Sequence, residues 1–263
     1  MNNDYINQSD GLLYCGNCNT PKQKRNEILT FLNDTTFPIN CKCQSEQLQL
    51  DIEQRKIIEK ANHIRNLRNA GIPDKRLQSY TFENDDGSCS NISKARTYVD
   101  NWNEMYETNT GLILWGDVGV GKTYFASCIV NALVDNEVSC MMINFAHILN
   151  KLGRLYPDER IEYIREFNRY KLLVIDDFGM ERDTAYVMEQ LYLVINSRYL
   201  SRQPLIVTTN LTLNELMNPT DMVHSRIYSR VTEMCMPIWF GGEDIRLKKA
   251  KDKFIEAKKL FTV

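Results

Sequence analysis

The sequence predicts an α/β fold, in which a mostly parallel β-sheet is flanked by helices, with a small additional domain at the N-terminus. Three observations lead to this prediction. Short apolar segments alternate with helix-length segments from about residue 92 onwards, a glycine-rich loop follows the first apolar segment, and four of the eight cysteines lie within the polar residues 1–43. Short buried strands that are separated by helices are typical of βαβ units, whose strands run parallel.

The domain organisation follows from changes in composition along the chain. A helix is predicted over 44–70, because this segment lacks Pro and Gly and carries an imperfect apolar stripe. Gly71 and Pro73 end this helix, and Asp85 and Asp86 are turn formers. We therefore expect an N-terminal domain, a linker and an α/β domain, at 1–70, 71–91 and 92–263 respectively.

The apolar segments of the α/β domain have the length of buried strands, and the segments between them carry helical spacing. Four strands are predicted, at 112–115, 139–143, 171–175 and 205–208. Helices are predicted between and after them, at 122–134, 146–156, 159–170 and 184–199. A final helix, which is rich in lysine, is predicted at 243–261.

Charge and composition exclude several classes of protein. The 32 Lys and Arg residues nearly balance the 34 Asp and Glu residues, which rules out a polyelectrolyte but not a local basic surface. No apolar run approaches the ~18–20 residues of a membrane span, and the first residues, MNNDYINQSDG, lack the apolar stretch of a signal peptide. We therefore expect a cytoplasmic protein without a membrane partner.

A glycine-rich motif follows the expected strand at 112–115. It consists of Gly116, Asp117, Val118, Gly119, Val120, Gly121, Lys122 and Thr123. This matches G-x-x-x-x-G-K-[ST] at every fixed position, and a helix is predicted directly after it. Backbone N–H groups of such a loop bind phosphate, Lys122 would reach the β- and γ-phosphates, and Thr123 would bind Mg²⁺. A glycine-rich turn with a surface lysine is the alternative, and the strand–loop–helix context disfavours it.

Two acidic residues, Asp176 and Asp177, end the apolar strand predicted at 171–175. Ligands bind outside the carboxyl ends of the strands in open α/β sheets, so these carboxylates should lie beside the phosphate loop. We assign Asp176 to Mg²⁺ through water, and Asp177 to the orientation or deprotonation of the attacking water. An isolated Asp at this position could also simply begin a turn.

Four further polar residues are candidates for the same site. Asn210 follows the strand predicted at 205–208 and could hold the attacking water, or merely cap the next helix. Arg226 and Arg230 lie four residues apart on one helix face, and Arg246 begins the last helix. Arginine stabilises charge on the γ-phosphate oxygens in the transition state, although spaced arginines can also belong to a solvated face.

Four cysteines near the N-terminus have the spacing of a zinc site. Cys15 and Cys18 form a CxxC pair, and Cys41 and Cys43 form a CxC pair. Four thiolates suit tetrahedral Zn²⁺, and a metal would stabilise a region that has few apolar residues. The alternatives are unpaired surface cysteines or a disulfide.

Together these motifs resemble those of the AAA+ ATPases, and within them the bacterial and phage replicative helicase loaders of the DnaC/DnaI type. The insertion-sequence helper ATPases of the IstB type share this core. The resemblance covers about residues 70–250 and implies ATP and Mg²⁺ as ligands. The positions carried over are Walker A at 116–123, Walker B at Asp176 and Asp177, sensor 1 at Asn210, the arginine finger at Arg230 with Arg226 as a second candidate, and sensor 2 at Arg246.

Two departures from the common AAA+ pattern concern the rate of hydrolysis. Walker B ends in Asp-Asp rather than Asp-Glu, and the lid is reduced to one short C-terminal helix at 243–261. Both departures resemble the loader subfamily. They favour a slow switch over a motor.

The resemblance implies a function in DNA replication. A zinc-bearing N-terminal domain that is joined to an AAA+ domain is similar to DnaI-type loaders, in which the N-terminal domain docks on the hexameric replicative helicase. The implied partners are this helicase, single-stranded DNA and further copies of the chain. The arginine finger of one copy would complete the ATP site of the next. Candidate DNA contacts are interleaved basic and aromatic residues at 154–170, unless these form an ordinary charged helix face.

Two alternatives remain at the level of the sequence. The first is an IstB-type transposition helper that binds ATP and acts on duplex DNA. The second is a nucleotide-bound adaptor without turnover. Tyr80 and Phe82 are the candidates for the adenine pocket.

Overall fold

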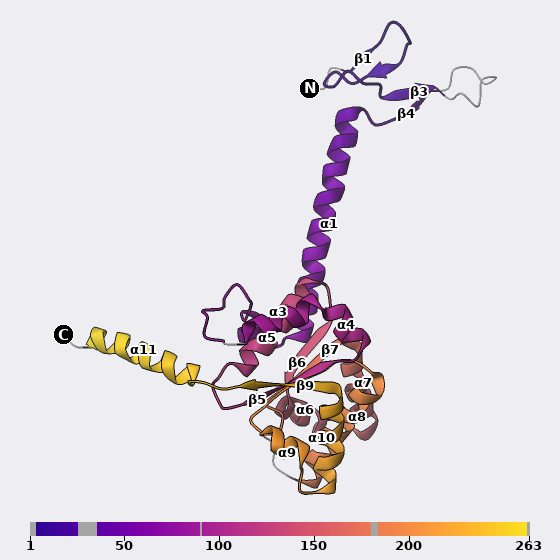
Figure 1. Cartoon of the computed structure of the whole chain (residues 1–263). Coiled ribbons are helices and arrows are strands. Elements are labelled where there is room, and N and C mark those ends of the chain that lie inside the picture. Colours follow the sequence, from indigo (N-terminus) through magenta and orange to yellow (C-terminus); the bar gives the residue numbers. More distant parts are fainter. Residues whose placement is uncertain (1–3, 26–35, 90, 180–183, 262–263) are drawn as a thin grey trace. The chain divides into compact units, whose positions relative to one another are not determined.

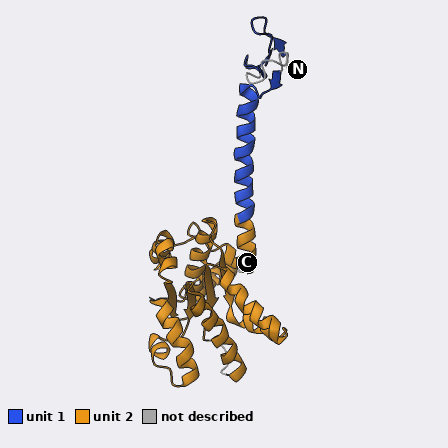
Figure 2. Ribbon diagram, turned by 90° about the vertical axis from the view of Figure 1, so that its right-hand side faces the viewer, with its two compact units in different colours: residues 1–63 blue, residues 64–263 orange. Residues whose placement is uncertain are grey.

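The structure is a computed structural model, and it describes residues 4–25, 36–89, 91–179 and 184–261. The chain divides into two compact units, residues 1–63 and residues 64–263 (Figure 2). The helix α1 (Lys42–Gly71), predicted over 44–70, contributes residues to both units.

The N-terminal unit has little apolar core. Two short antiparallel pairs precede α1, and they are formed by β1 (Tyr5–Ile6) with β2 (Leu13–Tyr14) and by β3 (Gln23–Arg25) with β4 (Thr36–Pro38). Among the described residues of this unit, only Cys15 and Cys41 are buried. Leu48, Ile52 and Ile57 of the predicted apolar stripe on α1 are exposed. Apolar packing therefore does not explain how this unit holds its shape.

A five-stranded parallel sheet forms the centre of the second unit (Figure 1). Its strand order is β6-β7-β8-β5-β9, and all neighbouring strands are parallel. The predicted α/β class is confirmed. The strands are β5 (Gly111–Gly116), β6 (Cys140–Asn144), β7 (Leu172–Asp176), β8 (Leu205–Thr209) and β9 (Cys235–Phe240).

Successive residues of a strand point to opposite faces of the sheet. Both faces of this sheet carry apolar side chains, and helices cover both. Leu112 and Leu114 of β5 pack in one apolar cluster, whereas Ile113 packs in the other. The first cluster includes α3 (Ile92–Asp100), α4 (Trp102–Glu107) and α5 (Lys122–Asp135). The second includes α6 (Phe145–Leu152), α7 (Pro157–Glu166), α8 (Ala185–Ser201) and α10 (Met222–Met234).

The remaining helical elements are short or lie at the end of the chain. They are α2 (Lys75–Gln78), the 3-10 turn η1 (Phe167–Arg169), α9 (Leu213–Met217) and α11 (Ile245–Phe261). Among the described residues, every helix is either too short or too polar to cross a lipid bilayer.

The strand β9 is absent from the sequence prediction. It follows α10 without an intervening turn and contains Pro237, which lacks a backbone N–H. Proline is tolerated on an edge strand, where one side of the backbone has no strand neighbour. β9 lies at the edge of the sheet and pairs with β5 alone, with Pro237 opposite Ile113.

The segment expected as a linker, residues 71–91, lies within the second unit, and several of its described residues are buried there. Ile72 and Leu77 are buried in the cluster that contains α5. The side-chain amide of Asn131 on α5 donates hydrogen bonds to the carbonyl oxygens of Leu77 at 2.8 Å and Tyr80 at 3.0 Å. The turn formers of this segment are local signals, whereas its packing depends on a helix about fifty residues further along the chain.

Arg198 on α8 is completely buried and connects the two segments that precede β7 and β8. Its guanidinium donates hydrogen bonds of 2.7–3.2 Å to backbone carbonyls of the chain that leads into β7 and β8, those of Phe167, Tyr170, Lys171 and Pro204. Burial lowers the pKa of Arg198 to about 9.

We expect Arg198→Met to lower the free energy of unfolding by about 3–5 kcal/mol, because several buried carbonyls lose their donor. Urea unfolding followed by circular dichroism measures this change. The matched variant Arg165→Met, at an exposed position of α7, should change stability by less than about 0.5 kcal/mol. Equal losses in the two variants would contradict a special role for the buried arginine.

Candidate functional site

The glycine-rich motif forms the loop between β5 and α5. Gly119 and Gly121 have φ angles of +81° and +97°. These lie in the left-handed region, which residues other than glycine rarely adopt. A Cβ atom on Gly119 would lie 2.1 Å from the Asp244 carboxylate. This glycine therefore provides room for a neighbouring residue as well as an unusual backbone conformation.

Lys122 is buried at the base of this loop and is held by three oxygen atoms. Its Nζ donates to the carbonyls of Gly116 at 2.7 Å and Asp117 at 2.5 Å and to Oδ1 of Asn210 at 2.8 Å. Burial lowers the pKa of Lys122. The sheet thus brings two predicted site residues together from segments far apart in the sequence.

Thr123 and Asp176 provide two adjacent oxygen atoms. The Thr123 hydroxyl donates to Oδ1 of Asp176 at 2.9 Å, and the Thr208 hydroxyl donates to the same atom at 2.7 Å. Burial raises the pKa of Asp176. A bound cation would act in the opposite direction, because its positive charge favours the ionised carboxylate. A hydroxyl and a carboxylate at this distance are a suitable start for a Mg²⁺ site, which needs further oxygen ligands from phosphate or water.

Asp177 has a positive φ of +57°, which is uncommon for a residue with a side chain. Its backbone N–H donates to the hydroxyl of Thr208 at 2.9 Å. Its Oδ2 accepts a hydrogen bond of 3.1 Å from the side-chain amide of Asn144, at the end of β6. The turn after β7 therefore directs the second acidic residue away from the first and toward the tip of the adjacent strand.

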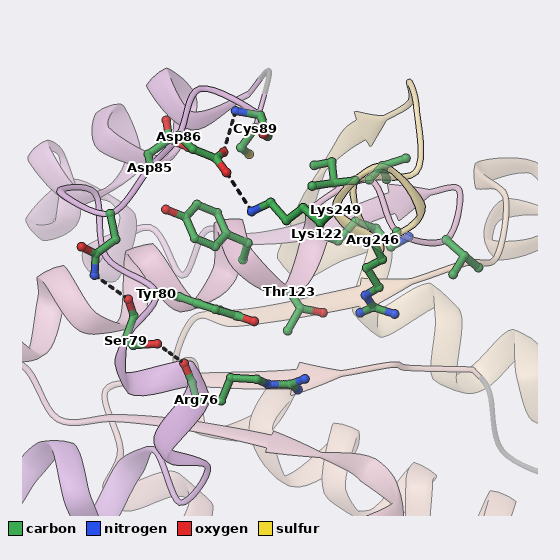
Figure 3. A pocket seen from close by; sticks show the side chains of 18 of the residues that line it. Arg76, Ser79, Tyr80, Asp85, Asp86, Cys89, Lys122, Thr123, Arg246 and Lys249 are labelled. Carbon is green, nitrogen blue, oxygen red and sulfur yellow. Dashed lines mark hydrogen bonds and ion pairs between the residues drawn. The ribbon is translucent and has the colours of Figure 1, made fainter. Parts of the chain in front are cut away.

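A cavity of about 430 Å³ opens over the loop (Figure 3). Lys122, Thr123, Asp177, Asn210 and Arg246 line it, as do residues of the segment 76–89. The volume exceeds that of a triphosphate, so the cavity leaves space for a nucleoside. Tyr80, one of the two candidates for the adenine pocket, also lines it. Phe82 packs against the apolar cluster instead, with the guanidinium of Arg96 4.4 Å from its ring.

Arg246 reaches the cavity because the first turn of α11 lies against the loop. The backbone N–H of Ile245 donates to the carbonyl of Gly119 at 3.0 Å. The carboxylate of Asp244 accepts hydrogen bonds from the backbone N–H groups of Arg246 and Leu247 at 2.8 and 3.1 Å. The first turn of the predicted lid helix is thereby fixed next to the phosphate-binding loop.

Arg226 and Arg230 do not line this cavity. The Arg230 guanidinium lies over the rings of Tyr192 and Tyr199, at 5.1 and 5.6 Å from their centroids. It also donates to the carbonyl of Arg226 at 2.5 Å. Of the three predicted arginines, the structure places only Arg246 in the cavity of its own chain.

The four N-terminal cysteines form a separate cluster. All four sulfur atoms lie within 4.8 Å of one another, and Cys43 Sγ lies 3.6 Å from Cys15 and 3.3 Å from Cys41. Four thiolates around Zn²⁺ have Zn–S distances of about 2.3 Å, which separates the sulfurs by about 3.8 Å. The donor set and its spacing could hold a metal ion.

The thiols of this cluster cannot all ionise readily without a cation. A hydrogen bond with the hydroxyl of Thr20 is the main cause that lowers the pKa of Cys18 to about 5. Hydrogen bonding to the sulfur of Cys41, and then to those of Cys15 and Cys18, raises the pKa of Cys43 to about 12. A divalent metal ion would remove this conflict by neutralising the thiolate charge.

Three residues that contact cavity-lining residues, but do not line the cavity themselves, are missing from the sequence prediction: Asn144, Thr208 and Asp244. Asn144 and Thr208 each occupy the carboxyl end of a strand, where the prediction searched only for acids and for one polar residue. Their positions at strand ends are a sequence signal that could have identified them. The sequence gives no signal for the contact of Asp244 with Gly119, because Asp244 lies in a loop without regular structure.

Comparisons with known proteins find relatives of two kinds, replicative helicase loaders and an ATP-binding protein of an insertion sequence. The replicative helicase loader DnaI of Bacillus subtilis is 24% identical over 266 residues, which is 92% of this chain and 81% of that protein. The loader DnaC of Escherichia coli K12 is 26% identical over 59% of this chain and 63% of its own length. An ATP-binding protein in an insertion sequence of Mycobacterium tuberculosis is 29% identical over 146 residues, 54% of this chain and 58% of that protein.

Solved structures show the same fold. The crystal structure of the DnaC helicase loader aligns with a TM-score of 0.54 at 24% identity, over 64% of this chain and all of that one. The DnaI structure aligns with a TM-score of 0.51 at 23% identity, over 65% and 93% of the two chains. The predicted fold, a parallel sheet flanked by helices around a phosphate loop, is confirmed.

A family model described as IstB-like ATP binding protein matches residues 43–253. This range includes the phosphate loop, both acidic residues, Asn210 and the three arginines, and it covers well over half of the chain. Relatives of this chain are named as replicative helicase loaders. The family resemblance predicted from the motifs is confirmed: this chain belongs to the family of IstB-like ATP binding proteins.

Proposed function

We propose that this protein is a cytoplasmic ATPase that loads a hexameric replicative helicase onto single-stranded DNA. The observation that carries the proposal is the alignment with the replicative helicase loader DnaI, which extends over 92% of this chain. Residues 64–263 are only about three quarters of the chain, so this similarity includes the N-terminal unit. The insertion-sequence relative aligns with 54% of the chain.

ATP would bind with its phosphates on the loop between β5 and α5. Lys122 would exchange its bonds to the Gly116 and Asp117 carbonyls for bonds to phosphate oxygens. Mg²⁺ held by Thr123 and Asp176 would neutralise phosphate charge. Asp177 would orient the attacking water, and Asn210 and Arg246 line the same cavity.

Two features support slow hydrolysis. Asp177 has a shorter side chain than the glutamate that is common at this position of AAA+ proteins, and its carboxylate is bonded to Asn144. A carboxylate that is shared with an amide is less available to a water molecule. We therefore propose that nucleotide turnover acts as a timed release signal.

Arg230, or Arg226 next to it, would complete the site of a neighbouring copy. Both lie outside the cavity of their own chain, and Arg226 is exposed. An arginine can stabilise transferred phosphate only by contact with it. The proposal thus requires an oligomer during loading.

The N-terminal unit would bind the helicase, with Zn²⁺ in the Cys15, Cys18, Cys41 and Cys43 cluster. Single-stranded DNA would contact the ATPase unit. Of the candidates at 154–170, Arg154 and Tyr156 are exposed and available. Tyr163 packs against Phe167 with ring centroids 5.0 Å apart, and Arg169 forms an ion pair with Glu162.

The test uses the replicative helicase encoded by the same genome. We expect a complex whose stability changes between ATP and ADP, and faster helicase unwinding of a forked substrate whose single strand is coated with single-strand binding protein. A chain that forms no ATP-modulated complex with the helicase, but assembles on duplex DNA with ATP, would instead be a transposition helper.

Asn144→Ala should raise the basal ATPase rate by about twofold to tenfold, because the Asp177 carboxylate is released from its hydrogen bond. Affinity for ATP should stay within about twofold, because Asn144 does not line the cavity. Single-turnover hydrolysis and equilibrium nucleotide binding separate these two effects.

Asn144→Asp serves as the matched control for stability. The Asn144 oxygen also accepts the Ala146 N–H at 2.8 Å and so caps α6. Aspartate keeps this cap, whereas alanine should lose about 1 kcal/mol. A fall in the hydrolysis rate of Asn144→Ala would show that Asn144 positions Asp177 rather than restrains it.

A further inference from the structure

Thr208 is a buried residue at the carboxyl end of β8, and its hydroxyl contacts both acids of the nucleotide site. Its exposed fraction is 1%, and it does not line the cavity. β7 and β8 run in parallel register up to Ile175 opposite Val207. The residues that follow in the two strands, Asp176 and Thr208, therefore lie at the same edge of the sheet.

The hydroxyl of Thr208 makes two hydrogen bonds of defined direction. It accepts the backbone N–H of Asp177 at 2.9 Å, because an N–H group can only donate. Its single hydrogen is donated to Oδ1 of Asp176 at 2.7 Å. Hydrogen bonds in such a series polarise and strengthen one another. One oxygen atom thus joins the backbone of the second acid to the side chain of the first.

The first consequence concerns the orientation of the Asp176 carboxylate. The terminal torsion of an aspartate side chain is broad, and two donors on one oxygen restrict it. Here Oδ1 accepts the hydroxyl of Thr208 and that of Thr123, the latter at 2.9 Å. Thr123 lines the cavity (Figure 3), whereas Thr208 does not. Thr208 therefore holds the acid from outside the site that Mg²⁺ would occupy.

The second consequence concerns the turn that carries Asp177. Its φ of +57° belongs to a region that a residue with a side chain keeps only when surrounding contacts hold it there. Thr208 supplies two such contacts, since its hydroxyl accepts the Asp177 N–H and its carbonyl accepts the Phe178 N–H at 2.8 Å. Only the first depends on the side chain of Thr208.

The next residue, Thr209, has the same chemistry without these contacts. It is also 1% exposed, and its hydroxyl donates to the carbonyl of Phe178 at 2.7 Å and accepts the Leu211 N–H at 3.1 Å. Successive residues of a strand point to opposite faces. Thr209 therefore shows what the loss of a buried hydroxyl costs this strand end when neither acid is its partner.

We propose, on the basis of the proposed ATPase function, that Thr208 is the positioning residue that couples the two acids. Its hydroxyl orients the Asp176 carboxylate for Mg²⁺, and through the Asp177 N–H it holds the acid that orients the attacking water. Groups that orient a metal ligand from outside are worth about tenfold to a hundredfold in metal affinity or activity. The affinity for ATP without metal does not depend on Thr208.

Thr208→Val removes the hydroxyl and keeps the branched shape of the side chain. At saturating Mg²⁺ we expect kcat for ATP hydrolysis to fall by about tenfold or more, with KM within about twofold. The gain in affinity for ATP that Mg²⁺ provides should fall by about tenfold, whereas affinity in EDTA should stay within about twofold. Titrations with a fluorescent ATP analogue, in Mg²⁺ and in EDTA, measure these affinities. Thr208→Ser keeps the hydroxyl and should restore both quantities to within about threefold.

Thr209→Val is the matched control, because it removes an equally buried hydroxyl with one donated and one accepted hydrogen bond. It should keep kcat and the gain from Mg²⁺ within about threefold. The proposal is overturned if Thr208→Val and Thr209→Val behave alike in both readouts while the wild-type chain binds ATP.

A measurement on the wild-type chain keeps the proposal testable if no Thr208 variant folds. The Asp177 amide should exchange its hydrogen with solvent at least about a hundredfold more slowly than an unstructured amide, because it is bonded to a buried hydroxyl. Exchange at the unstructured rate would overturn the proposal. Absence of ATP binding by the wild-type chain would refute the proposed ATP site itself.

Discussion

Lys122→Ala is expected to weaken the binding of Mg-ATP by about a hundredfold or more and to abolish hydrolysis. The residue is the buried cation at the base of the phosphate loop, where it now bonds to the carbonyls of Gly116 and Asp117 and to Asn210. Charge-assisted hydrogen bonds to phosphate are about twice as strong as neutral ones. Titration with a fluorescent ATP analogue measures the loss.

The control for this variant is Lys151→Ala, an exposed lysine on α6 with the same change in charge. It should leave the affinity for ATP unchanged. An unaltered affinity in Lys122→Ala would remove the basis for a nucleotide site at this loop. Asp177→Asn then separates turnover from binding: an ATPase loses hydrolysis but keeps ATP, whereas a nucleotide-bound adaptor shows no change in any readout.

Removal of the proposed metal ion from the N-terminal cluster is expected to disrupt the strand pairs β1–β2 and β3–β4 while ATP binding remains. The described part of this unit buries only Cys15 and Cys41, so it has no apolar core that could replace the metal. Binding of structural Zn²⁺ contributes about 10–16 kcal/mol in small zinc domains at neutral pH. Elemental analysis should find about one zinc per chain.

Cys18→Ser should lose the metal and the helicase complex, while the affinity for ATP stays within about twofold. Cys128→Ala is the control, because this buried cysteine of α5 lies outside the cluster. It should retain one zinc per chain. If the purified protein holds no metal and Cys18→Ser still binds helicase, the cluster has no such role.

The parallel sheet was predictable because its signals are local. Four of the five strands carry continuous apolar runs, and the segments between them carry helical spacing. The fifth strand, β9, escaped prediction because Pro237 and the preceding helix α10 both argue against a strand there. Its place at the edge of the sheet, beside β5, makes it acceptable.

The candidate site was predictable to the extent that each residue type and its place on a strand carry chemical meaning. The phosphate loop, Asp176 with Thr123, and Asn210 with Lys122 come together as the strand order requires. The contact of Asp244 with Gly119 could not be predicted in this way. It depends on which segment lies opposite the phosphate loop, and that is decided by three-dimensional packing.

The sequence by itself determined the fold class, the phosphate loop, the acid pair and the cysteine spacing, because these depend on periodicity and on short motifs with a fixed geometry. Only the tertiary structure decided that residues 71–89 are packed and line the nucleotide cavity. It also decided that Arg246 enters this cavity while Arg226 and Arg230 do not. Such contacts join residues far apart along the chain, and the free energy that fixes them comes from burial and hydrogen bonds formed only when the sheet and its helices assemble.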